Sequence, residues 1–134
     1  IETIIYDFEN YKIDALTGPL AYNDLINGKL VDPTNVYNKV IKFLLKGNDV
    51  LLGPNMIITK GIWQRVRNFV CLDDRLVHED IDLSINIIRN GGKIMRDDNL
   101  KVLTSARRIK NDPKSFFFVY PYRLIRTFLL NRNG

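Results

Sequence analysis

Three carboxylates and one histidine stand close together in this chain, at the start of a predicted apolar helix. Glu79, Asp80 and Asp82 follow His78, and the helix is predicted over residues 80–90. A buried helix has a rigid N-terminus, so an acid fixed there beside a cleft is suited to work as a general base. The helix dipole lowers the pKa of such an acid, whereas partial burial raises it, and the sequence leaves that balance open. The structural alternative is that these acids only stabilise the positive end of the dipole.

The predicted helix is apolar around most of its circumference, which is the pattern of a buried helix. Its apolar positions recur at helical spacing: Ile81, Leu83, Ile85, Ile87 and Ile88. Gly91 or Gly92 is the expected left-handed end of the helix. A helix of this kind needs other elements packed on several sides.

Length and composition indicate one globular domain. The chain has 134 residues, of which 46% are hydrophobic and 26% charged. The single cysteine, Cys71, excludes an intrachain disulfide, fits a reducing compartment, and is expected to be a small buried apolar residue. We find no signal peptide and no apolar run of about 18 residues, so we expect a cytoplasmic protein. Because Ile1 already lies in a predicted helix, we expect this chain to be a piece of a longer protein.

Charge is distributed unevenly along the chain. The segment from residue 101 onward has eight basic residues and one acid, a net charge of +7, so the first hundred residues carry −2 of the total +5. The basic residues of this segment are Lys101, Arg107, Arg108, Lys110, Lys114, Arg123, Arg126 and Arg132. Such a segment favours an anionic partner: phosphate, nucleic acid or anionic lipid headgroups.

Helices and short strands alternate along the sequence without regular βαβ spacing, which predicts an α/β fold with a mixed sheet and flanking helices. Helices are predicted over residues 2–10, 34–46, 60–67, 80–90 and 122–130. Strands are predicted over 12–22, with an interruption at Gly18-Pro19, and over 50–58, 93–96 and 100–104. Residues 23–33 are predicted to form a loop. We interpret Asp73-Asp74 as solvated turn residues and His78 as a surface or capping residue; neither is predicted to bind a metal.

Five segments together resemble a known enzyme family. They are Gly53-Pro54-Asn55-Met56-Ile57-Ile58-Thr59-Lys60 through Trp63, His78-Glu79-Asp80-Ile81-Asp82-Leu83-Ser84, Asn90-Gly91-Gly92-Lys93-Ile94, Leu16-Thr17-Gly18-Pro19, and Thr104-Ser105-Ala106-Arg107-Arg108. This order resembles the second half of family 2 glycosyltransferases, which have the GT-A (nucleotide-diphospho-sugar transferase-like) fold. The resemblance implies a partial GT-A fold, with residues 1–112 as the acceptor-side half of the domain and 113–134 as a C-terminal aromatic and basic helical segment.

The resemblance also implies roles for individual residues. Asp80 would be the catalytic base that takes a proton from an acceptor hydroxyl, and Glu79 would position the acceptor or Asp80. The acceptor side of the cleft would include Gly53, Pro54, Asn55 and Trp63. The chain would transfer sugar from a nucleotide-sugar donor to a glycan or lipid-linked acceptor, although we expect this chain alone to be inactive.

The leaving nucleoside diphosphate needs positive charge nearby. Arg107 and Arg108 are candidates to bind it, and an equally weighted alternative is a solvated basic turn. The resemblance implies a divalent cation, Mg²⁺ or Mn²⁺, bound mainly by an Asp-x-Asp motif in a half of the enzyme that would precede Ile1. The histidine that many family members place after the last strand is missing, because Thr104 and Ser105 stand there. We assign no metal ligand within this chain.

Two other classes of function compete with the transferase. A nucleic-acid-binding module would use the basic segment and its Phe and Tyr residues, but these aromatics lie in apolar runs, so we expect no nucleic-acid partner. A peripheral membrane contact, at the cytoplasmic face, would use the last predicted helix. Its residues for this purpose would be Tyr122, Arg123, Leu124, Ile125, Arg126, Phe128 and Leu129. The alternative is that these aromatic and apolar residues cover the sheet. A homo-oligomer is also compatible with the sequence.

Overall fold

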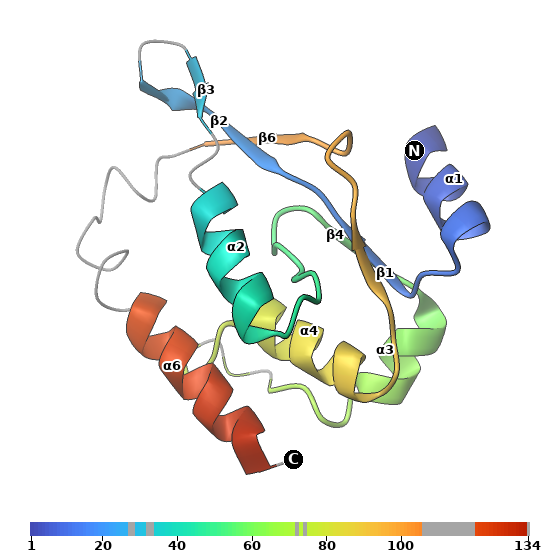
Figure 1. The fold of residues 1–134 in the computed structure, drawn as a ribbon, viewed down its shortest axis with the longest axis vertical. Helices are drawn as coiled ribbons and strands as arrows, with labels where there is room; N and C mark the ends of the chain where they lie inside the picture. The colour runs from blue at the N-terminus through green and yellow to red at the C-terminus, as the bar shows by residue number, and fades with distance from the viewer. Residues whose placement is uncertain (27–28, 32–33, 72, 74, 106–119, 134) are drawn as a thin grey trace.

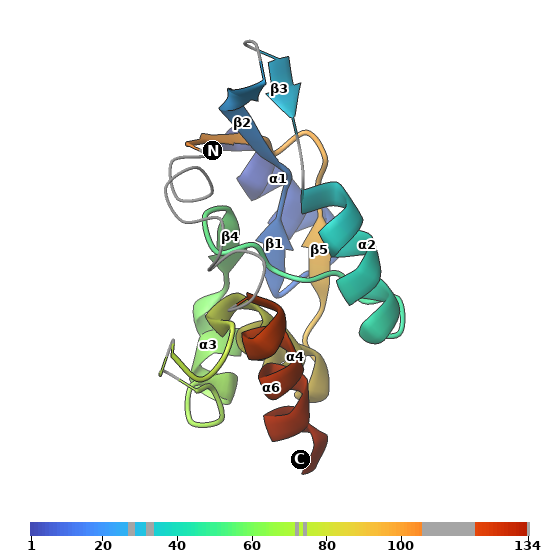
Figure 2. The same ribbon diagram turned by 90° about the vertical axis from the view of Figure 1, so that its left-hand side faces the viewer.

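The computed structural model is a mixed α/β fold, and it describes residues 1–26, 29–31, 34–71, 73, 75–105 and 120–133 (Figure 1). In chain order the elements are α1 (Glu2–Tyr11), β1 (Ala15–Thr17), β2 (Leu20–Ile26), β3 (Lys29–Val31), α2 (Thr34–Leu44), β4 (Met56–Ile58), α3 (Lys60–Val66), α4 (Glu79–Arg89), β5 (Ile94–Arg96), β6 (Val102–Thr104), α6 (Tyr120–Leu130) and the 3₁₀ turn η2 (Asn131–Asn133). The β2–β3 pair projects at one end of the molecule, and α6 lies toward the other (Figures 1 and 2).

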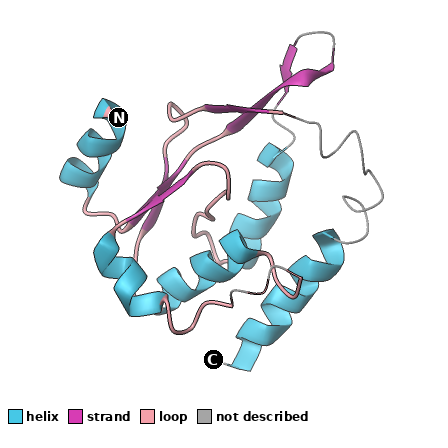
Figure 3. Ribbon diagram, turned by 180° about the vertical axis from the view of Figure 1, so that it is seen from behind, coloured by secondary structure: helices cyan, strands magenta, loops and turns pink. Residues whose placement is uncertain are grey.

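The strands form two small mixed sheets, with strand orders β4-β1-β5 and β3-β2-β6. In the first, β1 runs antiparallel to β4 and parallel to β5; in the second, β2 runs antiparallel to β3 and parallel to β6. Two connections link the sheets, because β1 continues into β2 and β5 continues into β6. The arrangement is therefore one strand layer bent in the middle, as the view from behind shows (Figure 3).

The bend lies at Gly18-Pro19, where the sequence predicted an interruption of the strand. A Cβ atom on Gly18 would lie 2.0 Å from the carbonyl oxygen of Leu100 and 2.9 Å from that of Asp97. Val102 donates its backbone N–H to the carbonyl of Pro19, so the β5–β6 connection follows the bend. Only glycine allows these two backbones to approach so closely.

Helix α4 is the centre of the apolar core, and it is almost continuously buried from Ile81 to Ile87. One core cluster joins α4 to β1, α3 and β5: Ala15, Leu51, Ile62, Val66, Leu83, Ile87 and Ile94. A second cluster joins α4 to α2: Ile41, Val50, Ile81 and Ile85. Helix α4 ends at Arg89 with Asn90 as its C-cap, and Gly91 follows with a φ of 74°, as the apolar periodicity and the glycine predicted.

Helix α6 packs against the N-terminal part of α4 through polar contacts. The Thr127 hydroxyl accepts from the backbone N–H of His78 at 2.9 Å, and the Arg123 guanidinium donates to the carbonyl of Val77 at 2.6 Å. Leu124 and Phe128 of α6 pack against the second core cluster. The predicted boundary between residues 112 and 113 lies outside the described residues, but α6 itself is closely attached to the rest of the fold.

Most sequence predictions of element type are confirmed, and two are wrong. The five predicted helices correspond to α1, α2, α3, α4 and α6, and the Thr59 side chain caps α3 by accepting from the N–H of Ile62. Residues 23–33 were predicted as a loop, but β2 extends to Ile26 and β3 follows. Residues 50–58 were predicted as one strand, but the chain turns at Leu52–Asn55 and only Met56–Ile58 pairs as a strand. Both errors have the same cause: these two segments contain polar residues or glycine, and the local sequence pattern alone assigns such segments incorrectly.

Candidate functional site

Asp80 meets the turn at Gly53, so two of the segments that carry the family resemblance touch. The backbone N–H of Gly53 donates to Oδ2 of Asp80 at 3.1 Å. The other carboxylate oxygen, Oδ1, accepts from the backbone N–H of Ile81 at 3.0 Å. The side chain lies in the first turn of α4 and is half-buried. Asp80 is therefore oriented by two backbone donors, without an arginine or lysine partner among the interactions of the described residues.

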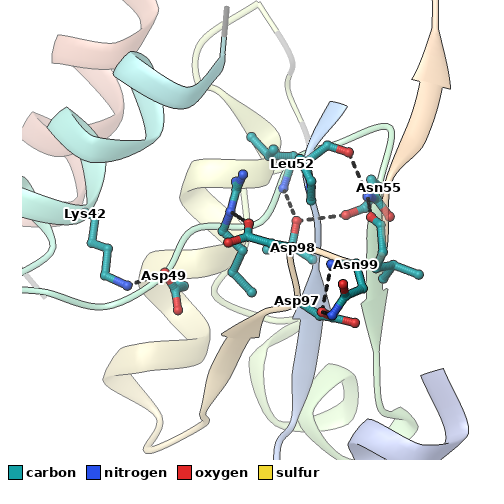
Figure 4. A network of polar contacts seen from close by, with 11 residues as sticks. Lys42, Asp49, Leu52, Asn55, Asp97, Asp98 and Asn99 are labelled. Atoms are coloured by element: carbon teal, nitrogen blue, oxygen red, sulfur yellow. Dashed lines mark hydrogen bonds and ion pairs between the residues drawn. The ribbon is translucent and has the colours of Figure 1, made fainter. Parts of the chain in front are cut away.

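The turn that carries Gly53 is itself held by the strand layer. The Thr17 hydroxyl accepts from the N–H of Leu52 at 3.2 Å and donates to the carbonyl of Asn55 at 2.8 Å. The Asn55 amide donates to the carbonyl of Leu100 at 2.7 Å. Figure 4 shows this network, with Leu52 and Asn55 beside the central strand. Because these groups are all paired and most of them are buried, the position of the turn is firmly defined.

The first turn of α4 is fixed to the same segment from the other side. The Ser84 hydroxyl donates to the carbonyl of Asp80 at 2.6 Å and accepts from the N–H of Leu51 at 2.9 Å. Ser84 is fully buried. The backbone of residues 51–53 therefore contacts both the side chain of Asp80 and the helix that carries it.

The Asp80 carboxylate has capacity for a further hydrogen bond. An ionised carboxylate offers about four lone-pair positions, and the two backbone donors occupy two of them. The side chain lies at the positive end of the α4 dipole. A half-buried, oriented carboxylate can accept a proton from a hydroxyl group that approaches it.

Asp82, two residues later, is structural. It is 3% exposed; its Oδ1 accepts from the Asn131 amide at 2.7 Å, and its Oδ2 accepts from the N–H of Cys71 at 2.8 Å. Asn86 adds a longer contact to Oδ2, at 3.4 Å. This carboxylate joins α4 to η2 and to the loop before α4. Sequence pattern alone did not separate Asp82 from its neighbours.

His78 and Glu79 differ from each other in burial. His78 is 7% exposed, so the predicted surface position is wrong; it stands at the N-cap position of α4, but its side chain makes no capping hydrogen bond. Its burial follows from α6, whose Thr127 covers the backbone at this point. Glu79 is exposed as the first residue of α4, next to Asp80. Its predicted positioning role stays a prediction.

The four predicted acceptor residues do not lie in equivalent places. Gly53 and Pro54 are exposed at the turn, whereas Asn55 is buried and its side chain is used inside the fold. Trp63 lies on α3 and is 37% exposed. Helix α3 packs near the opposite end of α4, where Arg65 contacts the carbonyl of Asn90 at 3.4 Å. The structure thus brings Gly53 to Asp80, and no contact of the described residues joins Trp63 to it.

The candidates for binding diphosphate, Arg107 and Arg108, lie outside the described residues. Within the part of the chain that the structure describes, no group of three or more His, Cys, Asp or Glu side chains gathers to hold a metal ion. The predicted Mg²⁺ or Mn²⁺ stays a prediction.

Two smaller predictions concern Asp73 and Cys71. Asp73 is a turn residue as predicted: it accepts from the backbone and the guanidinium of Arg75, and these hydrogen bonds lower the pKa of the Asp73 carboxyl. Asp74 lies outside the described residues. Cys71 is only partly buried, so the expectation of full burial is wrong; the loop before α4 leaves it partly open to solvent.

Helix α6 has one packed face and one exposed face. Leu124 and Phe128 pack against the core cluster of α2 and α4, which contains no strand residue, so the predicted covering of the sheet is not what they do. Tyr122, Ile125 and Leu129 are about 57 to 61% exposed. An apolar groove of about 700 Å³ runs between α2, α4 and α6. Asp80 does not line this groove. No helix in the described parts of the chain is both long and apolar enough to cross a bilayer. Peripheral membrane contact stays a prediction.

Sequence reasoning did not find a second group of polar residues, which surrounds Asn38 of α2. Asn38 lines a small cavity together with Lys39, Lys42, Asp49 and Arg96, but its amide nitrogen and oxygen are buried away from solvent. No motif signals this group, because its members come from three separate segments and meet only in the folded chain.

Comparison with known proteins adds no relative. Searches against protein-family models, curated proteins and solved structures each found no match to this chain.

Proposed function

We propose that this chain is the acceptor-binding and general-base half of a glycosyltransferase, and that its bent strand layer and helices form part of a GT-A fold. The observation that supports this most directly is the contact between Gly53 and Asp80, 3.1 Å long. Two segments that are distant in sequence, both part of the family resemblance, supply an oriented carboxylate and an exposed turn beside it. The donor nucleotide, with its divalent cation, would be bound by residues outside this sequence.

In this proposal Asp80 activates the acceptor. A hydroxyl of the acceptor approaches the exposed side of the carboxylate next to Gly53 and Pro54. Its oxygen attacks the anomeric carbon of the donor sugar, while its proton passes to a carboxylate oxygen of Asp80. The bond from the anomeric carbon to the diphosphate oxygen breaks, and the diphosphate leaves with the electron pair. Developing negative charge there needs basic residues, for which Arg107 and Arg108 stay the candidates.

The proposal predicts a large kinetic effect of a single substitution. In the complete natural protein that contains these residues, Asp80→Asn can keep only one of the two backbone hydrogen bonds, because its amide nitrogen cannot accept one, and it removes the proton acceptor. We expect kcat to fall by about 10² to 10⁴ fold with little change in stability. The measurement is release of nucleoside diphosphate from a panel of nucleotide sugars in the presence of acceptor glycans.

Glu9→Gln is the matched control, because Glu9 is an exposed carboxylate on α1 and is expected to leave kcat unchanged. Transfer by the Asp80→Asn protein at the rate of wild type would remove Asp80 from the mechanism.

A further inference from the structure

The apolar groove of about 700 Å³ between α2, α4 and α6, which we call the three-helix groove, has a lining that is only partly covered. Helices α2 and α6 both lie beside α4 (Figure 1). Ile85 of α4 lines the groove and is 6% exposed, and Leu124 and Phe128 of α6 pack against the core cluster that contains it. Ile125 and Leu129 line the groove from α6 and are exposed. Apolar side chains left open along a groove indicate that another molecule covers them.

The charged residues of the three-helix groove are all cations. Lys46, Arg89 and Arg132 line it, and none of its lining residues in the described chain is acidic. The ion pairs of the described residues join none of these three cations to a carboxylate. They stand at or just after the C-terminal ends of α2, α4 and α6, and each helix end contributes about half a negative charge. Three full positive charges outweigh three half charges, so the groove favours an anionic group.

Arg89 is held in place by side-chain hydrogen bonds that begin inside the fold. Its guanidinium donates to Oδ1 of Asn131 at 3.3 Å, and the Asn131 amide donates to Oδ1 of Asp82 at 2.7 Å. Asn131 is 8% exposed and also lines the groove. A guanidinium has five N–H donors, so Arg89 can still bind two oxygens of an anion. Arg132 is the residue after Asn131, which places two of the three cations at the same end of α6.

The size of the groove favours a small ligand over a protein partner. Sites for small molecules typically have volumes of about 300 to 1,000 Å³, and the groove falls within that range. A protein in a stable complex buries about 800 Å² of its own surface. The groove has eight apolar lining residues, of which only Leu44, Ile125 and Leu129 are exposed, and these cannot supply such an area. One alkyl chain with an anionic head matches both the apolar lining and the cations.

We propose that the three-helix groove binds a free single-chain anionic lipid, with its alkyl chain along Ile85, Leu124 and Phe128 and its carboxylate or phosphate head at Arg89 and Arg132. A guanidinium binds both kinds of head in the same bidentate manner. Asp80 does not line the groove, so this proposal goes beyond the transferase reaction, and each proposal can fail without the other.

The test is titration of the ¹⁵N-labelled chain with monomeric decanoate, decyl phosphate, decyltrimethylammonium and hexanoate, followed by backbone amide shifts. We expect at least one of the two decyl anions to bind about tenfold more tightly than the cation, with shifts at residues 44–48, 85–89 and 124–132. Each buried CH₂ group contributes up to about fourfold in affinity, so hexanoate should bind at least about tenfold more weakly than decanoate. Equal binding of the cation or of hexanoate, shifts elsewhere, or no binding at all would overturn the proposal.

Two further measurements identify other occupants. Vesicles of phosphatidylglycerol that bind the chain, when monomeric decanoate and decyl phosphate do not, would show that the partner is a membrane surface. A dimer that dissociates on Leu129→Ser, without binding of either decyl anion, would show that the partner is a second copy of this chain. Either result would overturn the proposal.

Matched variants separate binding of the head from binding of the alkyl chain. Arg89→Gln should remove the preference for decanoate over the cation, whereas Arg67→Gln, at an exposed arginine after α3, should preserve it. Leu129→Ser should weaken decanoate binding about tenfold, whereas Leu130→Ser, at an equally exposed leucine outside the groove, should not. All four residues are exposed, so the melting temperature should change by less than about 3 °C. Unchanged binding in both groove variants, or equal losses in their controls, would contradict the proposal.

Discussion

Buried polar groups have different surroundings in two regions of this molecule. Around the N-terminus of α4, the buried side chains of Thr17, Ser84, Asp82 and Thr127 are hydrogen-bonded. Beside the end of β5, buried Asp7 and Asn38 have side-chain atoms without a hydrogen-bond partner. Helices α1 and α2 carry these two residues on opposite sides of the strand layer (Figure 1). The paired groups stabilise the fold, whereas the unpaired buried groups weaken it.

The largest effect is expected at the bend that supports the paired region. Gly18→Ala places a Cβ atom against two backbone carbonyls, so residues 97–100 must shift. We expect the free energy of unfolding to fall by more than about 3 kcal/mol. Gly61→Ala is the control, because the added Cβ atom would meet nothing nearer than 4.0 Å. Residue 61 lies in helix α3, where alanine stabilises the folded state by about 0.5 kcal/mol relative to glycine. Urea unfolding measures both, and equal stability of the two variants would show that the close approach at Gly18 is unimportant.

The next effect distinguishes the two neighbouring aspartates. Asp82→Ala leaves the Asn131 amide and the N–H of Cys71 without their partner, so we expect a loss of about 3 kcal/mol in unfolding free energy. Asp80→Ala removes a half-buried carboxylate that backbone donors share with solvent, and we expect a loss of about 1 kcal/mol or less. Urea unfolding of both variants is the measurement. Equal losses would contradict the division into a structural and a functional carboxylate.

The smallest effect concerns Asp7 and depends on pH. Burial raises the pKa of the Asp7 carboxyl above its ordinary value of 3.8, and the charge of Asp97 raises it further. The folded chain therefore holds the proton more strongly than the unfolded chain, and wild-type stability falls as pH rises from about 3.8 through the raised pKa. The Asp7→Asn variant does not lose stability in this way, so its free energy of unfolding should exceed that of wild type by more at pH 7 than at pH 4. Urea unfolding across this pH range tests it, and parallel stability curves would contradict it.

The helices were predictable from sequence because each has a local signature. Helix α4 follows from its apolar spacing, its first-turn acids and Gly91, and the start of α3 follows from the cap at Thr59. The hairpin of β2 and β3 was missed because residues 23–33 are mostly polar and therefore indicated a loop. They contain Asn27-Gly28, a dipeptide typical of tight hairpins. The amphipathic pattern indicates a helix directly, whereas a short polar strand depends on its partner for identification.

The candidate site was predictable only in part. The pattern of residues 79–82 indicated acids at a rigid helix start, and the family resemblance placed Gly53 in the same cleft. The different surroundings of Asp80 and Asp82 depend on Asn131 and Cys71, which tertiary packing brings to Asp82 alone. The small cavity beside Asn38 of α2 depends on Arg96, which comes to α2 from a distant part of the sequence. Such groups leave no periodic or local signal.

The parallel pairing of β1 with β5 also determines the order in which the chain can assemble. Ala15, Leu16 and Thr17 pair with Ile94, Met95 and Arg96. A ribosome releases the first of these strands long before the second, so the central strand lacks this neighbour for most of synthesis. Helix α4 leaves the ribosome before β5, and the local contacts of the helices precede the long-range closure of the sheet. This topology therefore makes pairing of the strands a slow step that comes late in folding.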